Sequence, residues 1–229
     1  MRIETTQGAV DRAYRRLKEM AATYEFKPDE RLNEGALSAK LDISRTPLRE
    51  ALNRLTAEGF LTFKSGYGFS CRSLKPQEIM DLYEARTAIE SEAARLAARR
   101  ATPAAVAELE RFLSESAQHY SADNSAIELI RMDEAFHRRL AELGGNRELV
   151  HLLDNIAGRI HYIRIIDLQA LSERQGADQI TTDPHARILA AVKAGDESRA
   201  VDAIRSHITR RLEEVTHHVR TAYSLIYAP

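Results

Sequence analysis

The 229-residue sequence is short of cysteine and of long apolar runs. Its one cysteine, Cys71, cannot build a disulfide framework and suits a reducing compartment, so we expect a small strand residue facing a domain core. No apolar run approaches the ~20 residues that span a bilayer, and Met1-Arg2-Ile3-Glu4 does not begin a signal peptide. These features predict a cytoplasmic protein that does not use a membrane.

Histidine is absent from the first 118 residues, and no strand pattern follows residue 76. The length allows one small and one medium domain. We expect a first domain over residues 1–73, a linker over 74–77 in which Pro76 can begin a helix, and a second domain over 78–229. Helical spacing in the second domain predicts an all-α bundle of about six or seven helices. The segments are 76–100, 103–122, 124–143, 146–168, 178–194 and 196–222, with a polar loop at 172–177.

Residues 43–60 combine a short cationic entry, an amphipathic helix and a glycine stop. On a helix, Leu48, Ala51, Leu52 and Leu55 form one apolar arc. Thr46, Arg49 and Asn53 cluster on the other side. Ser44 or Thr46 can cap this helix, and a helix start that carries Arg45, Thr46 and Arg49 favours phosphate. The segment predicts a DNA recognition helix; the alternative is a core helix with a solvated cationic side.

The neighbouring segments favour the DNA-binding interpretation. Residues 33–41 suit a short helix followed by a turn at 42–44, as a helix-turn-helix requires. Residues 60–64 and 69–72 alternate around Ser65-Gly66-Tyr67-Gly68, which predicts a small hairpin, or wing. With Arg31-Leu32 ahead of it, this pattern over residues 8–73 resembles the winged-helix domain of GntR-type bacterial regulators.

The resemblance implies that Arg45, Thr46 and Arg49 contact operator DNA and that the wing around Gly66 approaches the minor groove. We add Ser44, Asn53 and Lys64 to the expected DNA-binding residues. Some relatives carry another arginine where this chain has Gly35 and Ala36. Residues 1–73 hold 13 Lys/Arg against 10 Asp/Glu, so this domain is only mildly basic. We therefore expect a homodimer that holds two half-sites of double-stranded DNA.

Three ionisable residues of the second domain fall on inward helix faces, and His207 lies at the shoulder of one. Asp133 and His137 are i and i+4 within an apolar arc. His185 and His207 lie ten residues before and twelve after Gly195, so antiparallel helices joined there place them at nearly the same height. Three imidazoles and one carboxylate suit a divalent ion such as zinc or nickel.

These residues, with Phe136, Ile188, Asp196 and Ala200, resemble the FCD effector domain of the FadR subgroup of GntR regulators over residues 76–220. The resemblance implies that Asp133, His137, His185 and His207 bind a divalent cation at the floor of an effector cavity. Relatives commonly have a glutamate before the third ligand, where this chain has Asp183-Pro184. The other five histidines match no ligand position.

Arg86 lies near the centre of an inward helical stripe, so it needs a partner. One interpretation is an ion pair with Glu90, and the other is a clamp for a ligand carboxylate. The subgroup resemblance favours the clamp. Asn155 and Arg159 flank an expected inward arc of Leu149, Leu152, Ile156 and Ile163, and they are further candidates for effector binding.

These features predict a transcriptional regulator, most simply a repressor, whose operator affinity responds to a small organic acid. A direct metal sensor is one alternative. A metal-dependent hydrolase is another, with Glu134 activating water. It leaves the winged helix unexplained, and Glu134 is expected to point away from the Asp133/His137 face. We therefore expect a regulator that is not an enzyme and has no catalytic residues.

Overall fold

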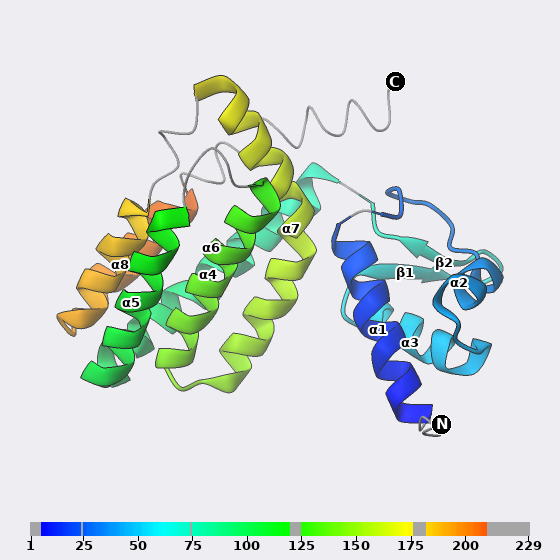
Figure 1. Cartoon of the computed structure of the whole chain (residues 1–229), viewed down its shortest axis with the longest axis horizontal. Coiled ribbons are helices and arrows are strands. Elements are labelled where there is room, and N and C mark those ends of the chain that lie inside the picture. The colour runs from blue at the N-terminus through cyan, green and yellow to red at the C-terminus, as the bar shows by residue number, and fades with distance from the viewer. Residues whose placement is uncertain (1–5, 24, 74, 120–124, 176–181, 210–229) are drawn as a thin grey trace. The chain divides into compact units, whose positions relative to one another are not determined.

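The computed structural model describes residues 6–23, 25–73, 75–119, 125–175 and 182–209. The chain divides into two compact units, Met1–Leu74 and Lys75–Pro229. The mainly α fold, with a winged helix-turn-helix and a helical C-terminal unit, confirms the predicted class (Figure 1).

The N-terminal unit contains α1 (Thr6–Ala22), α2 (Glu34–Leu41) and α3 (Arg45–Ala57). Asn33 caps α2 by accepting a hydrogen bond from the backbone N–H of Ala36. The apolar arc predicted for α3 is buried, and it packs against α1, a helix not predicted from the sequence. The core that joins them includes Ala13, Leu17, Met20, Leu48, Leu52, Leu55 and Phe60.

The predicted wing is a two-stranded antiparallel sheet of β1 (Leu61–Lys64) and β2 (Gly68–Cys71). Leu61 pairs with Cys71 and Lys64 with Gly68, so residues 65–67 form the loop. Gly66 adopts a φ of 77°, a left-handed conformation that glycine adopts without strain. Cys71 is buried in the core as expected, and burial raises the pKa of its thiol to about 12.

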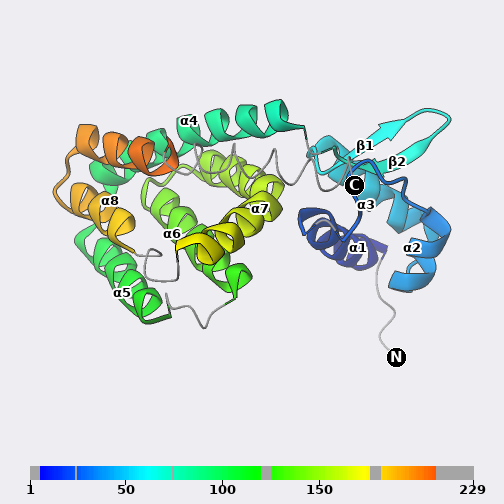
Figure 2. The ribbon, with the colours of Figure 1, turned by 90° about the horizontal axis from the view of Figure 1, so that it is seen from above.

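The C-terminal unit contains α4 (Pro76–Arg100), α5 (Pro103–His119), α6 (Ala126–Leu143), α7 (Arg147–Gln175) and α8 (Asp183–Lys193), and residues 197–209 are also helical. Helix α4 contacts α6, α7 and α8, and α5 contacts α6 and α8. Figure 2 shows α6 and α8 between α4 and α5. No helix within the described ranges is long and apolar enough to cross a membrane.

Helix α7 corrects two expectations. It continues through residues 172–175, where a polar loop was expected, because Ser172-Glu173-Arg174-Gln175 contains neither glycine nor proline. Its buried face also differs, since Leu152 is 47% exposed whereas Leu153 is 3% exposed. The remainder of the last expected helix, with His217 and His218, lies outside the described residues.

Candidate nucleic-acid interface and candidate metal centre

The exposed end of α3 opens onto a groove of about 730 Å³ in the N-terminal unit. Among its lining residues are Arg45, Thr46 and Arg49 from the first turns of α3, together with Arg31 and Tyr67. The guanidinium of Arg31 lies 5.3 Å from the centre of the Tyr67 ring. Three arginines around a helix N-terminus form a surface suited to phosphate and base edges.

Arg31 and Tyr67 were missed as candidate DNA contacts. They come together because Arg31 forms a β-bridge with Ser70, which joins the segment before α2 to the wing. Glu34 is a third unpredicted member of the groove, and its carboxylate lies 3.3 Å from Nε of Arg49. The groove therefore contains one acidic group, and that group pairs with Arg49, one of the expected DNA contacts.

The remaining expected DNA-binding residues are exposed but do not line this groove. Ser44 precedes α3, Asn53 lies farther along it, and Lys64 and Gly66 belong to the wing. The prediction that the side chain of Ser44 or Thr46 caps α3 was wrong. Ser44 occupies the N-cap position without a side-chain hydrogen bond, and Thr46 lies inside the first turn, because the helix begins at Arg45.

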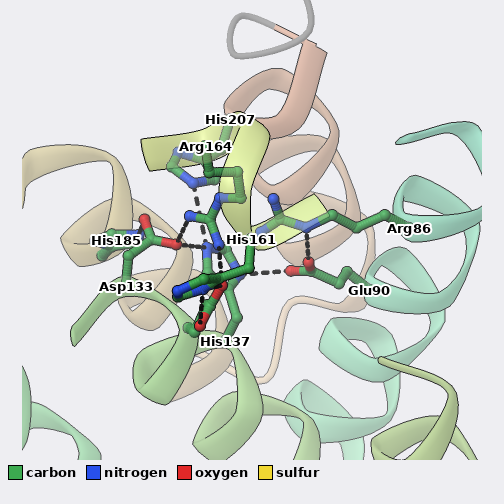
Figure 3. A network of polar contacts seen from close by, with 9 residues as sticks. Arg86, Glu90, Asp133, His137, His161, Arg164, His185 and His207 are labelled. Carbon is green, nitrogen blue, oxygen red and sulfur yellow. Dashed lines mark hydrogen bonds and ion pairs between the residues drawn. The ribbon is translucent and has the colours of Figure 1, made fainter. Parts of the chain in front are cut away.

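The four predicted metal ligands converge in the C-terminal unit (Figure 3). Asp133 and His137 come from α6, His185 from α8 and His207 from the helix over 197–209. All four are buried, and their ligand atoms lie within 4.8 Å of one another. The rings of His185 and His207 are 4.9 Å apart between centroids, as the expected hairpin geometry requires.

The spacing of these donor atoms fits a divalent ion. Nε2 of His137 lies 3.2 Å from Nε2 of His207 and 3.6 Å from Oδ2 of Asp133, and Nε2 of His185 lies 3.2 Å from Oδ1 of Asp133. Donors bound to one zinc ion at ~2.0–2.2 Å are separated by about 3.3–3.6 Å in tetrahedral geometry. Zinc and nickel both accept such a set of imidazoles and a carboxylate.

A second group of charges surrounds the ligands and was not predicted. Arg164 of α7 is buried and donates to Oδ2 of Asp133, and its Nη1 lies 3.4 Å from Oε1 of Glu134. Glu134 also lies 2.9 Å from Nδ1 of His161. The expectation that Glu134 points away from this site was therefore wrong, because Arg164 and His161 reach it from α7.

Arg86 and Glu90 form a buried ion pair on α4, with Nε and Oε1 2.5 Å apart. The other carboxylate oxygen of Glu90 lies 2.5 Å from Nδ1 of His137. Arg86, Glu90, His137 and Arg164 line a cavity of about 250 Å³ beside the ligands. The expected ion pair is thus present, and Arg86 also faces a space where an anion could bind.

Asn155 and Arg159 are partly buried on α7 and do not line this cavity. Arg138 and Asp154 do line it, and they form an exposed ion pair of 3.1 Å. Arg86 from α4 and Arg164 from α7 are thus the two buried arginines of the cavity wall.

The protonation states at the centre follow from burial and neighbouring charge. Burial by itself raises the pKa of Asp133, but Arg164 and His137 outweigh it and hold that pKa well below its usual range. Arg86 and His137 lower the pKa of Glu90 in the same way. Burial lowers the pKa of His207 well below its usual value, with His137 and His185 adding to the effect. The carboxylates are therefore ionised and His207 is neutral at pH 7, as metal ligands must be.

Comparison with known proteins identifies both units. Residues 9–70 match the gntR family of bacterial regulatory proteins, and residues 81–210 match the FCD domain. The chain belongs to the GntR family, in its FadR-like FCD subgroup. This regulator is 40% identical to the Nta operon transcriptional regulator of Aminobacter aminovorans, over 91% of this chain and 95% of that protein. It is 28% identical to the transcriptional repressor GlaR of Escherichia coli, over 85% and 90% of the two chains.

The fold is shared with solved GntR-family structures. Escherichia coli McbR/YncC superposes with a TM-score of 0.69 at 19% identity, covering 94% of this chain and 98% of that one. A GntR-family regulator from Rhodococcus gives a TM-score of 0.63 at 21% identity, covering 93% and 98%. The relatives and structural neighbours are transcriptional regulators and not enzymes.

The lowered pKa of His207 predicts that acid destabilises the metal-free regulator. Above a pH of about 6.5, the usual histidine pKa, His207 is neutral in both folded and unfolded chains. Below it the unfolded chain binds a proton that the folded chain does not, so the free energy of unfolding falls by up to about 1.4 kcal/mol per pH unit.

Urea unfolding in EDTA at pH 7.5, 6.5 and 5.5 should show this slope, with a smaller slope in His207→Asn. His151→Asn, which replaces an exposed histidine of α7, should keep the wild-type slope; equal slopes in all three chains would contradict the prediction.

Proposed function

We propose that this GntR-family chain is a cytoplasmic homodimeric repressor whose C-terminal unit binds a divalent metal ion and a small organic carboxylate that changes operator affinity. In this proposal residues 1–73 bind DNA, 74–77 link the domains, and 78–229 bind the effector. The main support is that four buried side chains of the kinds that bind metal ions converge beside a cavity. The buried Arg86 also lines this cavity.

The charge balance of the site supports an anionic effector. Glu90, Asp133 and Glu134 supply three carboxylates, and Arg86 and Arg164 supply two guanidinium groups, so these five residues carry a formal charge of −1. A bound divalent ion would change this to +1 and would offer coordination positions to a ligand oxygen. A carboxylate then neutralises a charge that is costly to bury alone.

The size of the cavity restricts the effector to a small molecule. Its volume of about 250 Å³ is below the ~300–1,000 Å³ typical of sites for drug-sized ligands. Arg86 offers the planar fork that binds a carboxylate through two hydrogen bonds. The effector changes operator binding only through its different affinities for two arrangements of the dimer, and typical couplings are ~1–3 kcal/mol.

Metal analysis and operator binding together test this proposal. The purified regulator should contain about one divalent ion per chain, and His185→Ala should lose it, because a set of three ligands loses charge balance and geometry. His151→Ala, an exposed histidine substitution on α7, should retain the wild-type metal content. Equal metal content in the two variants would contradict the assigned centre.

The operator assay uses a DNA fragment selected by the protein from a random library and a panel of small carboxylates. With metal bound, one class of acid should change the dissociation constant by about 5- to 150-fold. The same acid should have no effect on His185→Ala. A response to zinc alone, with none to any acid, would instead support the direct metal sensor.

A further inference from the structure

We infer that Glu90 is a positioning residue that orients the metal ligand His137 and links it to the anion clamp Arg86. The inference rests on the proposed function, because it assigns a role to a residue behind the proposed metal centre. One carboxylate thereby connects two parts of the site that come from different helices, α4 and α6 (Figure 3).

Each oxygen of Glu90 lies close to a different nitrogen: Oε1 accepts a hydrogen bond from Arg86, and Oε2 is at ion-pair distance from His137. Oε1 lies 2.5 Å from Nε of Arg86, one helical turn earlier on α4. Oε2 lies 2.5 Å from Nδ1 of His137 on α6. The side chains of Glu90 and His137 are each 2% exposed, so water does not compete for these contacts. A buried carboxylate with two such neighbours has little freedom to rotate.

The contact with Glu90 determines which nitrogen of His137 can bind a metal ion. A neutral imidazole carries one N–H and one lone pair. A carboxylate oxygen 2.5 Å from Nδ1 can only accept, so it favours the tautomer in which Nδ1 holds the proton and Nε2 carries the lone pair. Nε2 is the atom that faces His207 and Asp133. A carboxylate behind a ligating histidine fixes its tautomer and orientation, and it makes the ligand nitrogen more basic.

The same carboxylate makes the metal site sensitive to Arg86. Both Arg86 and Glu90 line the cavity beside His137. An anion bound to Arg86 competes with Glu90 for the guanidinium, which leaves Glu90 to bond more strongly to His137. Metal and anion should therefore strengthen each other's binding, and this coupling is reciprocal.

Two measurements on the full-length protein test the role of Glu90. In metal-free protein, long-range ¹H–¹⁵N NMR spectra should show His137 as the Nδ1–H tautomer, and Glu90→Gln should show a changed or mixed tautomer. Zinc titration against a chromophoric chelator should show that Glu90→Gln weakens zinc binding by about 10- to 100-fold. Glu90→Asp keeps the charge but is one methylene shorter, so it should weaken binding as well.

Two further variants separate positioning from general destabilisation. Arg86→Met removes the competing guanidinium and should strengthen zinc binding, the opposite sign to Glu90→Gln. Glu92→Gln removes a carboxylate of the same helix that pairs with Arg95 at the surface, and zinc affinity should stay within twofold of wild type. A merely structural role would lower zinc affinity in both Arg86→Met and Glu90→Gln.

The outcomes distinguish this inference from the proposed function. If Glu90→Gln binds zinc as tightly as the wild type and keeps the same His137 tautomer, the inference about Glu90 is wrong. The proposed metal centre is not contradicted by that result. If the wild-type protein binds no zinc, the proposed function fails, and the tautomer in metal-free protein still decides whether Glu90 orients His137. If Glu90→Gln does not fold, the tautomer and zinc affinity of Glu90→Asp provide the same decision.

Discussion

Arg49→Ala is expected to weaken specific operator binding by about 30-fold or more. Arg49 lies on the exposed face of α3 with 57% of its side chain accessible, beside Arg45 and Thr46 in the groove of the N-terminal unit. Losing one bidentate base contact costs about 1–3 kcal/mol, and a dimer loses it in both half-sites. The ion pair with Glu34 uses Nε and leaves both Nη groups available for the two acceptors of a guanine.

Fluorescence anisotropy on the selected operator and on a scrambled sequence measures this effect. Arg54→Ala is the matched control, because Arg54 lies on the same helix but pairs with Asp11 and Glu58 away from the groove. The control should lose less than twofold in operator affinity, and circular dichroism should show both variants folded. Operator affinity within twofold of wild type in Arg49→Ala would exclude α3 as the recognition helix.

The amphipathic helix α3 could be predicted from the sequence because its signals are local. The arc of Leu48, Ala51, Leu52 and Leu55 determines which face is buried, so Arg49 must lie on the opposite face. The convergence of the four candidate metal ligands could also be predicted, since Asp133 and His137 share a helix face and the Gly195 turn brings His185 next to His207. In both cases helical periodicity and one short connection are sufficient to place the residues.

The choice between Arg159 and Arg164 could not be made in this way. These residues are five positions apart, or about 140° around a helix, so they flank the same apolar arc on opposite sides. If Leu152 belongs to the core, the buried face of α7 is the one that lies nearer Arg159. In the structure Leu153 is buried instead, so the buried face lies nearer Arg164. Adjacent leucines leave this rotation undetermined until the packing of α7 against α4 and α6 is known.

The links made by Arg31 and Glu90 depend on contacts between distant segments. Arg31 reaches the wing through a β-bridge to Ser70, and Glu90 reaches His137 through the packing of α4 on α6. Helical spacing suggests the Arg86–Glu90 pair but says nothing about the second oxygen of Glu90. Such contacts require the tertiary structure, and they determine which charges surround the candidate metal ligands.

Arg86→Ala is expected to destabilise the C-terminal unit by about 3–5 kcal/mol and to remove the response to effector. Arg86 is 3% exposed, and its truncation leaves the buried carboxylate of Glu90 without its guanidinium partner. Arg86→Lys should restore part of the stability but little of the response, because an ammonium group cannot reproduce the planar two-bond contact to a carboxylate. Arg95→Ala is the control on α4: Arg95 forms partly exposed pairs with Glu92 and Glu197, and its loss should leave the melting temperature near wild type.

Thermal unfolding and effector titration of the same proteins separate the two roles of Arg86. Loss of stability measures its pairing with Glu90, whereas loss of the response at a temperature where the variant is folded measures its contact with the effector. A double-mutant cycle with Glu90→Gln should show a combined stability loss smaller than the sum of the single losses, because both changes break one pair. A large fall in melting temperature with an unchanged effector constant would leave Arg86 as a structural residue only, and the acid would then have to bind elsewhere in the unit.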